Sequence, residues 1–234
     1  MAKKKTAAAH MSGGEQLAGV VFFVIYLLVL PFATEPLFEL AEKLFKTELS
    51  SGLQSAIYYY ALFAVTLIIF RGYLAQTTRK ALDSAGGLFR AVLGGLVAFY
   101  GLNELVYRLT QLFMENRTNL NEMAISAQID NAPRTTMLIV IFLAPFVEEV
   151  LFRGLVFGGL KEKNRVVAYA VSCILFALLH VWQFAVVSQD VTYLLLMVQY
   201  LVPGLVLAGV YDRSGTLWAP LILHMAVNAM AVLI

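Results

Sequence analysis

The chain has 234 residues, 60% of them hydrophobic and only 14% charged, with a net charge of +2. Soluble domains are about 45–50% apolar and about 25% charged, so this composition excludes a disordered or fibrous protein and almost every water-soluble enzyme, and it does not indicate nucleic-acid binding. The one cysteine, Cys173, excludes an internal disulfide framework and a cysteine-rich metal site.

Residues 1–16 are expected to form a cytoplasmic tail without a cleavable signal peptide. A helix needs about 20 mainly apolar residues to cross a bilayer. The stretches that satisfy this requirement are 17–33, 55–70, 88–107, 136–160, 166–187, 191–211 and 215–234. The predicted fold class is therefore all-α, a polytopic transmembrane bundle of about seven spans without internal repeats.

Two polar segments interrupt the predicted spans. From Thr34 to Ser50, apolar residues recur at helical spacing between charged ones, which predicts an amphipathic helix on the membrane surface. The longest polar stretch, 108–135, is predicted to carry a short surface helix. The chain is accordingly divided into the tail, an N-terminal helical part (17–135) and a C-terminal core (136–234).

Lys and Arg residues in short loops predict the orientation in the membrane, because cytoplasmic loops carry an excess of them. Alternate loops hold ten such residues on one side and five on the other. The richer set is Lys3–Lys5, Arg71, Arg79, Lys80, Lys161, Lys163, Arg165 and Arg213. The amino terminus is therefore expected in the cytoplasm and the carboxyl terminus outside.

The fourth predicted span contains two adjacent glutamates and an arginine, Glu148, Glu149 and Arg153. Charged side chains in a membrane helix cost free energy, so their presence indicates a structural or functional role. Glu149 and Arg153 are four residues apart and are expected to form an ion pair on one helical face. Glu148 lies about 100° away and has no partner in its own helix. A carboxylate so buried suits a general base near neutral pH; the alternative is that all three residues only hold helices together.

The last spans contribute imidazoles and an amide. His180 follows Phe176 by four residues, and Asn228 follows His224 by four, so each pair shares a helical face. Alone, His180 is more often a packing residue, and His224 with Asn228 is more often an interhelical clasp. Together with Glu148, the set supplies a base, a second imidazole and an amide donor, and it is predicted to converge on one cavity as a hydrolytic site.

At these residues the sequence resembles the CAAX protease and bacteriocin-processing membrane proteins, also called the type II CAAX prenyl endopeptidase or ABI family. The family pattern is Glu-Glu-x-x-x-Arg, then Phe-x-x-x-His, then His-x-x-x-Asn, and all three motifs occur here in order. The resemblance covers about 136–234. The chain ends soon after Asn228, so a further helix of some relatives is expected to be missing.

The resemblance implies an intramembrane glutamate protease. Glu148 and His180 would activate a water molecule, and His224 and Asn228 would form the oxyanion hole. Glu149, Arg153 and Phe176 would support the site. No cofactor and no metal are expected, because the His-Glu-x-x-His spacing of a zinc protease is missing.

The sequence therefore predicts an endopeptidase that cuts a membrane-associated peptide or a lipidated, for example prenylated, protein in the bilayer. Its small size and short loops favour a prokaryotic plasma membrane. One alternative is a non-enzymatic scaffold, such as a bacteriocin-immunity or regulatory protein that keeps the motif for structure. Another is a proton-coupled transporter that uses Glu148 as carrier, although the internal repeat typical of such folds is not found.

Overall fold

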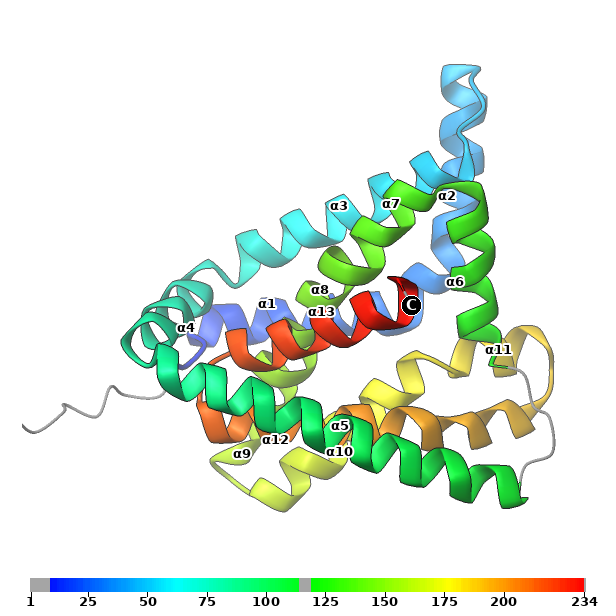
Figure 1. Ribbon diagram of the computed structural model, residues 1–234. Helices are drawn as coiled ribbons and strands as arrows, with labels where there is room; N and C mark the ends of the chain where they lie inside the picture. The colour runs from blue at the N-terminus through cyan, green and yellow to red at the C-terminus, as the bar shows by residue number, and fades with distance from the viewer. Residues whose placement is uncertain (1–8, 114–118, 234) are drawn as a thin grey trace, which may run out of the picture.

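A computed structural model describes residues 9–113 and 119–233, and every regular element within these residues is a helix. The helices form one bundle around the middle of the fourth apolar segment (Figure 1). In chain order they are α1 (Gly13–Val24), the π-helical turn η1 (Ile25–Val29), α2 (Leu30–Phe45), α3 (Ser51–Ile69), α4 (Arg71–Asp83), α5 (Ala85–Phe113), α6 (Leu120–Asn131), α7 (Pro133–Leu138), the π-helical turns η2 (Ile139–Leu143) and η3 (Val150–Phe157) on either side of α8 (Ala144–Glu149), α9 (Gly158–Lys161), α10 (Arg165–Leu179), α11 (Trp182–Val187), the 3₁₀ segment η4 (Val191–Leu196), α12 (Met197–Ser214) and α13 (Trp218–Leu233).

The predicted all-α polytopic bundle is confirmed. Among the described residues, five helices are long and apolar enough to cross a membrane: Gly13–Phe45, Ser51–Ile69, Ala85–Val106, Pro133–Lys161 and Val191–Ser214. Two shorter apolar helices, Arg165–Leu179 and Trp218–Leu233, lie where the fifth and seventh spans are predicted. Large apolar side chains such as Leu17, Ile68 and Val97 are more than 70% exposed, which suits contact with lipid rather than water. The chain is an integral membrane protein.

The fourth apolar segment is the centre of the bundle. In its most apolar stretch 56% of the residues are buried, against 11% in the corresponding stretches of α3 and α5. Pro145 near the start of α8 cannot donate a backbone hydrogen bond, and a π-helical turn, η2, lies just before it. A second π-helical turn, η3, follows Glu149 and contains Arg153. The predicted acidic motif therefore occupies the most enclosed part of the protein.

The amphipathic segment from Thr34 to Ser50 differs from its prediction. It is not a separate helix, because α1, η1 and α2 form one continuous helix over Gly13–Phe45. Pro31 and Pro36 both lie inside this continuous helix, and Pro31 comes just after the π-helical turn η1. The far end of α2 projects from the bundle in Figure 1. The helix ends at Lys46, which has a left-handed backbone conformation (φ 50°).

The sequence also missed α4 and a break in the fifth span. In α4, Tyr73, Thr77 and Ala81 are buried at helical spacing, a pattern that could have predicted this helix despite its polar composition. The fifth span is divided into α10 and α11 at His180 and Val181. The reason is local: the His180 imidazole bonds the Phe176 carbonyl, while the His180 and Val181 amides turn back to carbonyls only three residues earlier. The short surface helix predicted within 108–135 is confirmed as α6.

One end of the bundle brings together α4, α9 and α12, which border the predicted basic loops. The Tyr73 hydroxyl of α4 lies 3.1 Å from the Tyr211 hydroxyl of α12, and the Lys161 ammonium lies 5.2 Å from the centre of the same Tyr211 ring. The start of α4, the end of α9 and the end of α12 are therefore neighbours (Figure 1). Lys3–Lys5 lie outside the described residues. This arrangement agrees with the predicted alternation of loops rich and poor in Lys and Arg. Which side of the membrane this end of the bundle faces stays a prediction.

We expect reporter fusions after Gly87, Lys163 and Ser188 to report inside, inside and outside, since the first two follow basic loops and the third does not. Paired alkaline phosphatase and green fluorescent protein fusions would measure this. A Lys163 fusion active outside the cell would reverse the predicted orientation.

Candidate active site

The acidic motif lies at the join between α8 and η3. Glu148 and Glu149 are both buried, and the Glu149 and Arg153 side chains have no exposed surface. Arg153 Nε lies 3.3 Å from Glu149 Oε2, so the predicted ion pair is confirmed. The contact is electrostatic rather than a well-directed hydrogen bond, because neither atom meets its partner in hydrogen-bonding geometry. Arg153 therefore places a positive charge beside the buried Glu149 carboxylate.

His224 of α13 bridges the two glutamates. Its Nδ1 lies 2.9 Å from Glu149 Oε1, and its Nε2 lies 3.8 Å from Glu148 Oε2. An ionised carboxylate only accepts hydrogen bonds, so Nδ1 carries a proton and donates to Glu149. When Nε2 is protonated as well, His224 and Arg153 together balance the charges of Glu148 and Glu149. The sequence predicted that Glu148 has no partner in its own helix, but it did not predict this partner from another helix.

Arg153 also joins the helices around the site. Its Nη2 donates a hydrogen bond of 3.3 Å to the Gly204 carbonyl of α12, and its Cζ lies 4.4 Å from the centre of the Phe176 ring of α10. A Cβ on Gly204 would lie 3.3 Å from the Cα of Cys173, so the glycine allows α12 to approach α10 closely. Sequence reasoning missed Gly204. The adjacent Pro203–Gly204 inside an apolar helix was the available signal.

His180 lies at the end of α10. Its Nδ1 is 2.8 Å from the Phe176 carbonyl oxygen, which can only accept, so Nδ1 carries the proton and the neutral ring keeps a lone pair on Nε2. The Phe176 ring contacts both imidazoles, with centroid distances of 4.7 Å to His180 and 5.9 Å to His224. Among the described contacts none joins His180 directly to Glu148. Their joint action through a water molecule remains a prediction.

Asn228 lies one turn after His224 in α13. Its Nδ2 donates a hydrogen bond of 2.9 Å to the Val140 carbonyl in η2. This is the interhelical clasp that the sequence left open as an alternative. An amide group has two N–H donors, so one donor of Asn228 ties α13 to η2 and the second can serve another acceptor.

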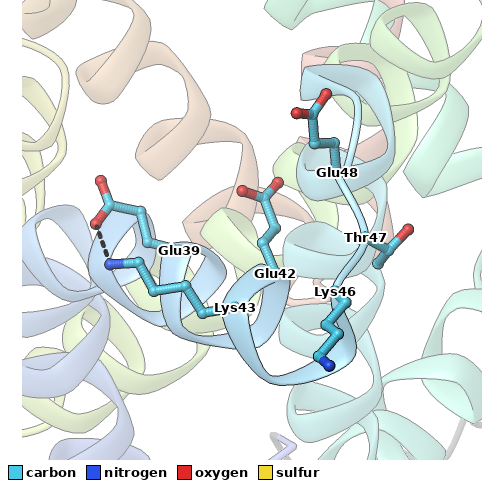
Figure 2. A pocket seen from close by; sticks show the side chains of 6 residues that line it. All are labelled: Glu39, Glu42, Lys43, Lys46, Thr47 and Glu48. Atoms are coloured by element: carbon cyan, nitrogen blue, oxygen red, sulfur yellow. Dashed lines mark ion pairs between the residues drawn. The ribbon is translucent and has the colours of Figure 1, made fainter.

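Two hollows stand out in the structure, and neither is lined by Glu148, His180, His224 or Asn228. Figure 2 shows one at the end of α2, lined by charged side chains such as Glu39, Lys43 and Glu48. There the 3.9 Å Lys43–Glu39 pair is largely exposed, so it is a weak surface contact. The other is an apolar hollow of about 410 Å³ that borders α10 and α11 at Leu178 and Trp182. A common cavity for the four predicted catalytic side chains stays a prediction.

A metal site was not expected. In the part of the chain that the structure describes, no three His, Cys, Asp or Glu side chains are grouped so that they could hold a metal ion. The cluster instead pairs carboxylates with an arginine and an imidazole, and an arginine cannot act as a metal ligand because it stays protonated.

The fold and the site together define the class of this protein: it is an integral-membrane helical bundle with a buried cluster of acidic and imidazole side chains. Comparison with known proteins adds a similarity: residues 131–230 match the model of the type II CAAX prenyl endopeptidase Rce1-like family. The chain is also 28% identical over 187 residues to a Bacillus subtilis (strain 168) protein named "Putative membrane peptidase YdiL", covering 79% of this chain and 72% of that protein. No solved structure matches. The resemblance to the CAAX protease family is confirmed, and all three motifs lie within the matched residues.

Proposed function

We propose that this protein is an intramembrane endopeptidase, which hydrolyses a peptide bond in a membrane-associated or prenylated peptide or protein by means of an activated water molecule. The observation that carries the proposal is the buried cluster in which His224 bridges Glu148 and Glu149, with Arg153 behind Glu149. Charged groups inside a membrane protein are costly and are typical of functional sites. The similarity to a family of membrane endopeptidases supports the same reaction class.

In the proposed reaction, Glu148 removes a proton from water while the oxygen attacks the scissile carbonyl carbon. Nε2 of His180 accepts a hydrogen bond from the same water. The oxyanion that forms is stabilised by Nε2–H of His224 and the second N–H of Asn228. Glu148 then returns its proton to the leaving nitrogen, so one water is consumed and the two products are a carboxylic acid and an amine.

His224 can act in the oxyanion hole only in one protonation state. Its Nδ1 proton is directed to Glu149, so a donor at Nε2 requires the doubly protonated ring. The two flanking carboxylates lie 3.8 Å from Nε2 and 2.9 Å from Nδ1 of that ring. Glu149 is therefore proposed to set the orientation of His224, and Arg153 to hold Glu149 in place.

A non-enzymatic membrane scaffold is the second candidate, because Glu149, Arg153, His224 and Asn228 all make contacts between elements of the bundle. A proteomic comparison of membranes separates the two candidates. Strains that differ only in Glu148→Ala should differ in the peptides left in the membrane, and an uncleaved precursor should accumulate in the variant. Identical peptide profiles at equal protein levels would contradict the peptidase.

We expect the activity to withstand metal chelators, because the proposed base and oxyanion donors are side chains of the protein. Cleavage should be unchanged within about twofold after dialysis against EDTA or 1,10-phenanthroline, a range that corresponds to less than about 0.5 kcal/mol in the barrier. A zinc peptidase treated in parallel serves as the control. Loss of activity that added zinc restores would show a metal mechanism.

A further inference from the structure

The ring of Tyr200 on α12 stacks on the imidazole of His180. The two ring centroids are 4.4 Å apart, and the planes differ by only 20°. The hydrogen bond from Nδ1 to the Phe176 carbonyl fixes one atom of the imidazole, but the ring can still rotate about that contact. A flat ring stacked on its face removes this freedom, so the direction of the Nε2 lone pair is set by Tyr200.

Tyr200 is itself held in place from outside α12. Its hydroxyl donates to Asn119 Oδ1 at 3.1 Å and accepts from Asn119 Nδ2 at 2.8 Å. Asn119 is the residue that caps the start of α6, where its Oδ1 accepts the backbone amides of Asn121 and Glu122. The hydroxyl is thus anchored to a residue whose own side chain is fixed by several bonds.

We propose that Tyr200 is a positioning residue for His180, anchored by Asn119. The inference rests on the proposed function, in which Nε2 of His180 orients the attacking water. Asn119 lies outside residues 131–230, which match the family model, so a residue of the N-terminal helical part (17–135) contributes to the alignment of the site. Errors of about 1 Å in the placement of a reacting group can cost about 10² in rate.

Two substitutions at Tyr200 distinguish the effect of the stacked ring from the effect of the hydroxyl group. Tyr200→Leu removes the stack and should lower kcat by about 10²-fold with little change in KM, since the water is misaligned while peptide binding is not. Tyr200→Phe keeps the stack and loses only the anchor, and it should lower kcat a few-fold, about 2–5 times. Tyr193, a half-buried tyrosine of η4, provides the controls Tyr193→Leu and Tyr193→Phe, which should keep wild-type kcat.

The four variants and the wild type should be compared as purified full-length protein, with thermal melts to verify folding and with the peptide identified by the proteomic comparison. A wild-type kcat for Tyr200→Leu would overturn the proposal. If Tyr200→Leu does not fold, Tyr200→Phe decides, and a kcat equal to that of Tyr193→Phe would overturn it. Failure of the proposed function looks different: Glu148→Gln would then retain cleavage, whatever happens at Tyr200.

Discussion

Glu148→Gln is expected to abolish peptide hydrolysis, by about 10³-fold or more, while the protein stays folded in the membrane. The amide has nearly the shape of the carboxylate, but it cannot accept a proton from water. General base catalysis contributes about 10²–10⁴ to a rate, and the same group must also protonate the leaving nitrogen. Cleavage of the accumulated precursor by detergent-solubilised protein, together with a thermal melt, measures both parts of the prediction.

The control for this variant is Glu104→Gln. Glu104 lies on α5 in an exposed pair with Arg108, away from the acidic motif in the sequence, and its substitution should leave cleavage unchanged. If Glu148→Gln cleaves at the wild-type rate and Glu149→Gln does not, the base and the supporting residue have been assigned the wrong way round. If both variants cleave normally, the glutamate mechanism is wrong for this chain.

Arg153→Ala should cause the largest loss of stability. Removal of Arg153 leaves Glu149 as a fully buried carboxylate without its arginine partner, at a cost of about 3–5 kcal/mol. The hydrogen bond to Gly204 and the contact with Phe176 are lost at the same time. Denaturant or thermal unfolding in a defined detergent measures the loss of stability. The variant Arg108→Ala, which changes an exposed pair, is measured in parallel.

The two arginines make a matched comparison, because each lies four residues after its glutamate. The Glu104–Arg108 pair is exposed, so Arg108→Ala should cost less than about 1 kcal/mol. Glu149→Gln combined with Arg153→Met should recover part of the loss seen in Arg153→Ala, since no unpaired charge then remains. Equal effects of Arg153→Ala and Arg108→Ala would contradict the buried ion pair.

Local spacing in the sequence predicted those parts of the site that lie within one helix. The four-residue interval between Glu149 and Arg153 was enough to predict their pairing, and the structure shows it. The length of the apolar stretches likewise predicted the positions of the membrane helices, apart from the break in the fifth span. Both predictions depend only on helix geometry and on the cost of charge in a bilayer, and neither requires knowledge of how the helices pack.

Contacts between distant helices could not be predicted in this way. Nothing local indicates that His224 lies between two glutamates, that Arg153 reaches the Gly204 carbonyl, or that Tyr200 stacks on His180. The break at His180 was missed for a related reason. A hydropathy profile averages over many residues. The break in the helix instead depends on one side chain, the His180 imidazole, which competes for a backbone carbonyl.

The most direct test of the proposed activity is cleavage by the purified protein alone, reconstituted in lipid vesicles with its precursor peptide. The peptide profiles of two strains could also differ if this protein were a scaffold that regulates another protease. Vesicles that contain only this chain exclude that explanation. Single-turnover measurements should show the wild type converting the precursor into two fragments and Glu148→Gln leaving it intact. A folded wild-type protein that leaves the precursor uncut, or a Glu148→Gln variant that cuts it equally fast, would contradict the peptidase.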